Sequence, residues 1–543
     1  RDLHSFPTRR SSDLLSLEAK ALKRTQRKAL AVTRATPKAG RYADNSVLAT
    51  GRWAKIRVPA SGVYQITENL IKQAGFNDIN KVKVYGYGGN LQNERLDGVE
   101  LQAKDDLKEV PTCLIGGKRL FYAKGPVSWS SVSATVRTRN PYSDYGYYFL
   151  TQSDGEPLRV DESTFLNAFY PSADDYHSLH EVDNFSWYPG GRNLFENTPI
   201  SRGTKKSYTI DAPVADVGGS ITVSLSAGTA TRANISLNGE RLGEINVSIP
   251  TQYDKGNKAD FYANIVRFAA KNEVTIEVTE GGPARLDFIS IATNKPRSAP
   301  DLHAATIPAP QYVHNITSQN LHAHGAADMV IVIPTSQKLR QEAERLKAFH
   351  EKHDGMRVRI VPADELYNEF ASGTPDANAY RRYLKMLYDR AENEADQPKY
   401  LLLFGDCAWD NRMKTADWRT ASVDDYLLCF ESEDSFNEIT CYVDDGFFTL
   451  LDDGEGVNLE RSDLQDVAVG RFPVVHPDDA GTMVDKTIAY AQNANAGAWQ
   501  NTIMFMGDDG NQNLHMSDAN RMADSVAVEH PQYLIKKVMW DIT

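Results

Sequence analysis

Residues 399–411, with the sequence KYLLLFGDCAWDN, constrain the fold of this chain more than any other stretch. The apolar run YLLLF shows no alternation, and it predicts a strand buried on both faces of a parallel sheet. Polar residues begin where this strand ends. Asp406, Cys407 and Asp410 therefore fall at its carboxyl end, the edge of an open α/β sheet where ligands bind. The structural alternative is that Asp406 only anchors the loop and that Cys407 is a small buried thiol.

Strand and helix patterns alternate from Asp328 onward. Six runs predict strands, namely MVIVIP, MRVRIV, KYLLLFGD, DVAVGRFPV, NTIMFMGDDG and YLIKKV. The helical patterns between them include one with Leu339, Ala343 and Leu346 on a single stripe, and one expected to begin after an N-cap at Thr374. Such alternation, with right-handed crossovers, predicts a mainly parallel sheet covered by helices on both faces.

The sequence before this region has β character. RWAKIRVP, GVYQIT, KVKVYGYGG, RLFYAKGP and YGYYFLT predict a first β domain, and four later runs, among them SITVSLSAG and NEVTIEVTE, predict a β-sandwich. Asn238-Gly239 marks a hairpin within the sandwich. The expected organisation is a non-native or disordered segment at 1–45, a β domain at 46–165, a β-sandwich at 181–295, a linker at 296–325 and the α/β domain at 326–543.

Two segments admit both a structural and a functional interpretation. Residues 138–150, TRNPYSDYGYYFL, are rich in aromatics that either stack on a ligand or pack one face of a sheet. Four histidines in or beside the linker form a tract that either binds a metal or is simply solvated, namely His303, His314, His322 and His324.

Composition excludes several classes. A length of 543 residues predicts about three or four domains. The net charge of −12, with no basic patch on an expected folded element, argues against nucleic-acid binding. The four cysteines have no zinc-type spacing, no run reaches the length of a membrane span, and no signal peptide is visible. The first residues, RDLHSFPTRRSSDL, read as translated adapter sequence, and we expect the chain to be an interior fragment of a longer protein.

Acidic residues between the third and fourth expected strands suggest a second kind of site. Asp452, Asp453 and Glu455 alternate with glycines and offer the oxygen ligands that calcium prefers, although the spacing is not that of an EF-hand. The alternative is a solvated acidic turn. The strand ends are not followed by a Gly-rich loop with a Lys, so the sequence gives no indication of a phosphate site. A thiol nucleophile requires a nearby base, and His515 is the candidate partner of Cys407.

Long stretches resemble one family. KYLLLFGDCAWDN, ELYNEFASGTPDA, FESEDSFNEITCYVDDGFFTLLDDGEG, DVAVGRFPV and the upstream GRWAKIRVPASGVYQIT and TRNPYSDYGYYFLT are similar to the PorU-type, gingipain-like sortases of the type IX secretion system. The resemblance extends from about Ser46 to Thr543. It implies N-terminal β domains followed by a caspase-like α/β peptidase domain that is incomplete at its C-terminus.

The resemblance also implies a function. Members are cysteine peptidases at the outer membrane of Bacteroidetes-type bacteria that remove the C-terminal signal of cargo and join cargo to lipopolysaccharide. Outer-membrane secretion components are the other implied partners, and no cofactor is required. The family's catalytic His and Cys are expected beyond Thr543, so no catalytic residue is carried over and the fragment itself is expected to be inactive.

Four strand-end carboxylates remain as expected cleft residues, chosen by topology: Asp406, Asp410, Asp444 and Asp445. The rival hypothesis is a non-catalytic surface or secretion component that uses its β domains for binding.

Overall fold

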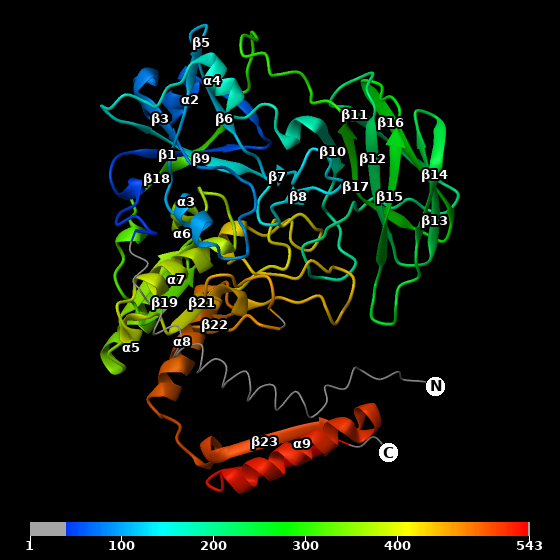
Figure 1. Ribbon diagram of the computed structural model, residues 1–543. Coiled ribbons are helices and arrows are strands. Elements are labelled where there is room, and N and C mark those ends of the chain that lie inside the picture. The colour runs from blue at the N-terminus through cyan, green and yellow to red at the C-terminus, as the bar shows by residue number, and fades with distance from the viewer. Residues whose placement is uncertain (1–39, 460, 541–543) are drawn as a thin grey trace. The chain divides into compact units, whose positions relative to one another are not determined.

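The computed structural model describes residues 40–459 and 461–540, and these form two compact units (Figure 1). The large unit comprises residues 40–480, and the small unit includes residues 481–540. Each is described separately below.

The large unit begins with an antiparallel sheet in the order β18-β1-β9-β3-β4, which faces a smaller sheet in the order β2-β6-β5. Alternating residues such as Ile56, Val84 and Leu150 point from the first sheet into a core shared with Phe121 of the second. The strands are β1 (Trp53–Val58), β2 (Gly62–Ile66), β3 (Val82–Tyr85), β4 (Glu109–Val110), β5 (Cys113–Ile115), β6 (Lys118–Ala123), β9 (Gly146–Gln152) and β18 (Gln311–Ile316). The helices are α2 (Glu68–Gln73), α3 (Gly98–Ala103) and α4 (Glu162–Asn167), and β7 (Val127–Ser128) pairs with β8 (Thr138–Arg139).

Strand β18 lies within residues 296–325, which the sequence predicts to be a linker. It pairs antiparallel with β1, so this segment returns to the first sheet after the sandwich has been completed. The sequence QYVHNI has few apolar residues, and the strand is at most half-buried along its length. Its pairing with β1, rather than a pattern of its own, makes it a strand.

Two four-stranded antiparallel sheets form the sandwich, visible in green in Figure 1. Alternate residues from both sheets, such as Val223 and Ile276, fill its core. The predicted hairpin is confirmed, because Asn238 and Gly239 have positive φ angles of 51° and 85° between paired strands. One sheet contains β10 (His177–Glu181), β17 (Ala284–Thr293), β12 (Gly219–Ala227) and β15 (Asn257–Ile265); the other contains β11 (Lys205–Asp211), β16 (Lys271–Glu280), β13 (Thr231–Leu237) and β14 (Glu240–Val247).

The expected α/β fold is confirmed by a parallel sheet in the order β20-β19-β21-β22. These strands are β19 (Met329–Ile333), β20 (Val358–Pro362), β21 (Tyr400–Phe404) and β22 (Ala468–Phe472), and the helices are α5 (Arg340–His353), α6 (Ala363–Phe370) and α7 (Asn378–Arg390). Helix α8 (Pro477–Ala491) begins at the end of this unit, and most of its residues belong to the small unit. Val332 and Leu403 lie in one core with Phe370 of α6 and Tyr383 of α7, while α5 contacts β19 and β20. The apolar run YLLLF is therefore a central buried strand.

The prediction that Thr374 caps a helix is wrong. Helix α7 begins at Asn378, and the Thr374 hydroxyl instead donates to the carbonyl oxygen of Gly88 at 3.2 Å. The same hydroxyl accepts the backbone N–H of Tyr147 at 3.2 Å. Thr374 is thus used to join the α/β region to the first β domain.

The small unit contains a parallel pair, β23 (Thr502–Asp508) and β24 (Leu534–Trp540), connected by α9 (Gly510–Glu529). Across the described parts of both units, no helix has the length and apolar character needed to span a bilayer.

Candidate functional site

Three parallel strands of the large unit, β19, β21 and β22, end at one edge of the sheet. Gly405 follows β21 at a close approach, since a Cβ there would lie 2.8 Å from the ring of Pro334. The next residue, Asp406, donates its N–H to Val474 O and accepts the N–H of Leu427. Its carboxylate accepts the N–H of Cys407 at 2.9 Å. Asp406 therefore anchors the loops of this edge.

Asp410 also holds its own loop. It is 3% exposed, and its carboxylate accepts backbone N–H groups of Arg412, Lys414 and Thr415 at 3.3, 2.6 and 2.7 Å. All these bonds stay within residues 410–415. The carboxylate therefore fixes the shape of this loop at the edge of the sheet.

Asp444 and Asp445 begin the 3₁₀ turn Asp445–Thr449. The Asp444 carboxylate accepts the N–H of Gly446 at 2.7 Å, and burial raises its pKa. Asp445 forms a two-pronged ion pair with Arg471 of β22, with N–O distances of 2.7 and 2.9 Å. Asp445 is one of the four carboxylates predicted to shape a cleft, and its ion pair joins the 3₁₀ turn to β22.

Arg471 is a site residue that the sequence reasoning missed. Besides Asp445, it donates to the carbonyl oxygens of Gly405 at 3.0 Å and Leu428 at 3.4 Å. Burial opposes the charged form, but the hydrogen bond to Asp445 and the charges of Asp445 and the nearby cysteines together outweigh it and raise the pKa of Arg471. The available signal was an arginine within an otherwise apolar strand, which needs a buried acceptor.

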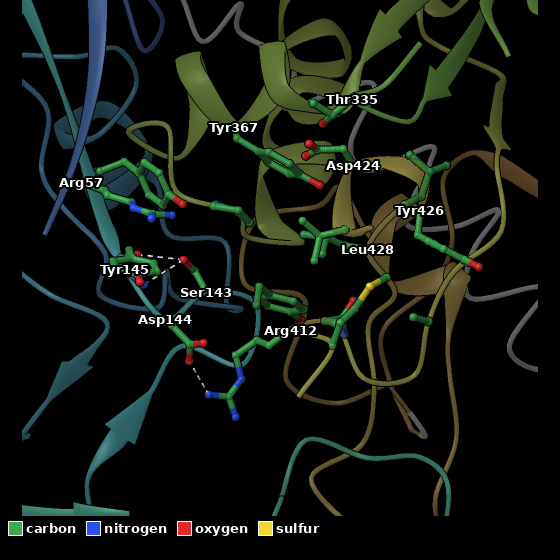
Figure 2. A pocket seen from close by; sticks show the side chains of 18 residues that line it. Arg57, Ser143, Asp144, Tyr145, Thr335, Tyr367, Arg412, Asp424, Tyr426 and Leu428 are labelled. Carbon is green, nitrogen blue, oxygen red and sulfur yellow. Dashed lines mark hydrogen bonds and ion pairs between the residues drawn. The ribbon is translucent and has the colours of Figure 1, made fainter. Parts of the chain in front are cut away.

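A pocket of about 210 Å³ opens at this edge, between the α/β region and the first β domain. Figure 2 shows Thr335, Tyr367 and Tyr426 on one side and Arg57 and Tyr145 on the other. The pocket is lined by residues from strands β1 and β9, helix α6 and several loops, namely Arg57, Tyr142–Tyr145, Tyr147, Thr335, Tyr367, Pro375, Ala408, Asn411–Met413 and Val423, Asp424, Tyr426–Leu428.

Aromatic rings and polar groups are interleaved on these walls. The guanidinium carbon of Arg57 lies 4.0 Å from the centroid of the Tyr145 ring. Tyr142 is 4% exposed, and its hydroxyl has no hydrogen-bond partner among the described residues. Tyr142, Tyr148 and Phe149 belong to buried cores, as the packing interpretation of residues 138–150 predicts. Tyr142 and Tyr145 also line the pocket, and stacking of a ligand there stays a prediction.

The expected calcium ligands each contact protein groups. The Tyr388 hydroxyl donates to Asp452 at 3.3 Å, and Asp453 pairs with Arg41 and Lys385. Glu455 accepts the N–H groups of Asp452 and Leu464, each at 3.1 Å, and burial raises its pKa to about 7. Within residues 40–459 and 461–540, no group of three or more His, Cys, Asp or Glu side chains is placed to hold a metal. Calcium binding here stays a prediction.

The four histidines of the expected tract have different surroundings. His322 is fully buried, with Nδ1 2.6 Å from Glu369 and Nε2 3.2 Å from Asp105, which corrects the interpretation of a solvated histidine. His324 contacts the Tyr383 hydroxyl, His303 lies beside Glu162, and His314 is in β18. The burial follows from Glu369, which accepts the N–H of His322 and so draws the linker onto α6.

Each member of the proposed Cys407–His515 pair has another partner. Cys407 is half-buried, and the neighbouring Cys429 thiol lowers the pKa of the Cys407 thiol. His515 Nδ1 lies 2.5 Å from Asp508 within the small unit. The Cys407–His515 pairing stays a prediction.

Comparison with known proteins bears on this edge of the sheet. Residues 322–542 match the family model for peptidase family C25. This region is therefore similar to the domains of that family, and the recognition made from sequence motifs is confirmed.

A solved structure extends the similarity upstream. The crystal structure of dimeric latent PorU from Porphyromonas gingivalis matches with 29% sequence identity and a TM-score of 0.71. The match covers 85% of this chain and 52% of that one, so this chain spans about half the length of that protein. The N-terminal β domains are thus part of the shared architecture.

A family 35 carbohydrate-binding module from Clostridium thermocellum also matches, at 16% identity and a TM-score of 0.16, over 21% of this chain and 87% of that one. Among curated proteins, no sequence matches the chain.

Proposed function

We propose that this chain is part of a type IX secretion sortase, a cysteine endopeptidase that removes the C-terminal signal of secreted cargo. The match of residues 322–542 to peptidase family C25 and the similarity of the chain to PorU support this function. The new carboxyl end of the cargo would be joined to lipopolysaccharide at the cell surface of a Gram-negative, Bacteroidetes-type bacterium. Outer-membrane components of the secretion system would be its other partners.

The tyrosine-lined pocket would contribute part of the substrate cleft. The observation that carries this role is a pocket lined by tyrosines at the carboxyl edge of the region that matches family C25. The tyrosine rings offer surfaces for the side chains of a peptide. Asp406, Asp410, Asp444 and Asp445 would position the loops that form the pocket.

The chemistry would follow the thiol–imidazole route. A cysteine thiolate attacks the scissile carbonyl, the imidazolium gives its proton to the leaving amine, and an acyl-enzyme forms. Water or an acceptor amine then attacks this thioester and releases the thiolate. We propose that the cysteine and histidine of this step follow Thr543 in a longer product of the same gene.

Peptide binding tests the proposed cleft. We expect a fluorescent peptide that spans a cargo signal junction to bind the purified chain, with no hydrolysis. Tyr145→Ala should weaken binding at least about fivefold, because it removes a ring from the wall. Tyr400→Ala is the matched control, since Tyr400 lies at the opposite, amino end of β21 and should leave the affinity unchanged.

Cleavage tests the activity. A longer gene product that contains this chain should cut the same peptide, and replacing its later cysteine should abolish the cut. If the longer product binds the peptide without cutting it, the chain is instead part of a non-catalytic binding component. Binding that is equally strong after Tyr145→Ala would contradict the proposed cleft.

A further inference from the structure

Two cysteines lie together at the carboxyl edge of the parallel sheet, and the proposed peptidase chemistry uses neither of them. Cys407 follows β21, and its backbone forms a bridge with Leu427. Two residues after that bridge, the Cys429 sulfur donates to the carbonyl oxygen of Ala408 at 3.3 Å. The thiol of Cys429 therefore contacts Ala408, the residue that follows Cys407.

The side chain of Asn411 fixes the position of Cys429. Asn411 Oδ1 accepts the N–H of Cys429 at 3.0 Å, and its Nδ2 donates to the carbonyl oxygen of the same residue at 3.1 Å. Arg471 also connects the segment of Cys407 to that of Cys429, because it donates to the carbonyl oxygens of Gly405 and Leu428. The two cysteine-bearing segments are thus held side by side by four hydrogen bonds that involve side chains.

Exposure and charge make the two thiols unequal. Cys429 is fully buried, whereas Cys407 is only half-buried. The neighbouring Cys429 thiol lowers the pKa of Cys407, while Cys407 and burial raise the pKa of Cys429, and the guanidinium of Arg471 lowers the pKa of Cys407 further. Burial raises the pKa of Cys113 and of Cys441, the latter to about 12. A half-buried thiol of lowered pKa, on a segment held beside that of a second thiol, is suited to form a redox-active pair.

We propose that Cys407 and Cys429 form a reversible disulfide bond when the protein meets a peroxide. The Cys407 thiolate attacks one peroxide oxygen, the O–O bond breaks, and hydroxide leaves and takes a proton from solvent. The product is a sulfenic acid at Cys407. Cys429 then attacks this sulfur, and its thiol proton leaves with the hydroxyl group as water. One peroxide is reduced to two waters, and two thiols are oxidised to one disulfide.

The bond would join two walls of the tyrosine-lined pocket. Ala408 and Asn411 come from the segment of Cys407, and Leu427 and Leu428 come from that of Cys429. Oxidation would therefore fix the distance between these walls, whether or not the pocket binds cargo. A reductant such as a dithiol would reverse the bond by thiol exchange.

Mass spectrometry tests this proposal on the purified, fully reduced chain. Equimolar hydrogen peroxide should remove two of its four titratable thiols, and dithiothreitol should restore them. A digest without reductant should contain a linked pair of peptides with Cys407 on one and Cys429 on the other. Trypsin leaves Cys429 and Cys441 on one peptide, because no Lys or Arg lies between them, so a second digestion after acidic residues must separate them.

Single replacements distinguish this pair from the others. Cys441→Ser and Cys113→Ser should still lose two thiols, whereas Cys407→Ser should lose none at the same peroxide concentration. Cys407→Ser is preferred to Cys429→Ser, because the half-buried position tolerates a hydroxyl better than the fully buried one. A linked peptide that contains Cys441 or Cys113, or a chain that retains four thiols, would overturn the proposal.

Discussion

Arg471 shows how much of the candidate site depends on one side chain. It connects the end of β21, the segment at Leu428 and the turn at Asp445 through hydrogen bonds to each. Its side chain is 10% exposed, so its loss leaves three acceptors without a donor in a mostly dry environment.

We therefore expect Arg471→Met to lower the free energy of unfolding by about 3 kcal/mol, as for other broken buried pairs. Urea denaturation measures this change. Arg267→Met is the control, because Arg267 and Asp216 form an exposed pair and its loss should cost less than about 1 kcal/mol. Equal effects of the two replacements would contradict the role given to Arg471.

His322 predicts a pH dependence. Burial disfavours its charged form, but hydrogen bonds with Asp105 and Glu369 outweigh burial and raise its pKa to about 9. The unfolded value is near 6.5, so protonated His322 stabilises the fold fully below about pH 6.5. This stabilisation is lost as the pH rises from about 6.5 to about 9.

The expected loss over that window is about 3 kcal/mol, and His322→Gln should not show it. Lys55 complicates the wild-type curve, since burial lowers its pKa to about 8 and it therefore adds stability as the pH rises above that value. The measurement is thus the difference between wild type and variant in urea denaturation at pH 6 and pH 9.5. His303→Gln, at an exposed histidine, is the control. A difference that does not change with pH would disprove the charged state of His322.

At the scale of elements, the acidic segment 431–443 packs against the sandwich. The backbone of Lys255 donates to Phe436 O at 2.8 Å, and that of Glu438 donates to Tyr253 O at 3.1 Å. The Phe436 ring lies 5.2 Å from that of Phe195. The segment therefore connects the α/β region to the sandwich.

Phe436→Ala should release this segment, because the ring is its main apolar contact with the sandwich. We expect a loss of about 2 kcal/mol and faster hydrogen exchange at the backbone amides of Lys255 and Glu438. Exchange monitored by mass spectrometry measures the effect. The neighbouring Ile439 is 49% exposed, and Ile439→Ala should leave exchange unchanged. Unchanged exchange in Phe436→Ala would contradict the docking.

Sequence patterns predicted elements that carry their own periodicity. The run YLLLF was recognised as a buried parallel strand, and the alternating strands of the sandwich were recognised with its Asn-Gly hairpin. β18 was not recognised, because it owes its strand form to β1. The end of β21 lies where the pattern placed it, but the partners of Arg471 and the tyrosine-lined pocket depend on contacts between distant segments. No local pattern contains that information.

At the scale of the large unit, Arg412 joins three regions. Its guanidinium is 4% exposed and pairs with Asp144 of the first β domain at 2.8 Å and with Asp183, next to β10 of the sandwich, at 2.7 Å. Arg139 also contacts Asp144 and Asp183, which extends the network. Arg412 itself lies in the segment that follows β21, so the network connects both β regions to the cleft.

Arg412→Met should uncouple these regions. We expect about 3–5 kcal/mol of destabilisation and a calorimetric transition that splits, with one region melting first. Lys414→Met is the matched control, because Lys414 pairs with the same Asp144 but is 41% exposed, so its loss should cost less than about 1 kcal/mol. A single transition at unchanged temperature in Arg412→Met would show that the network does not couple the regions.

The return of β18 to β1 has a consequence for biosynthesis. During translation, β1 emerges long before its edge partner, because the whole sandwich is encoded between them. The sandwich pairs only strands from its own continuous stretch and is free to fold as soon as it leaves the ribosome. The edge of β1 in the nascent first sheet therefore stays unpaired until Ile316 has been synthesised. During that interval, a chaperone that binds extended strands could bind to this edge.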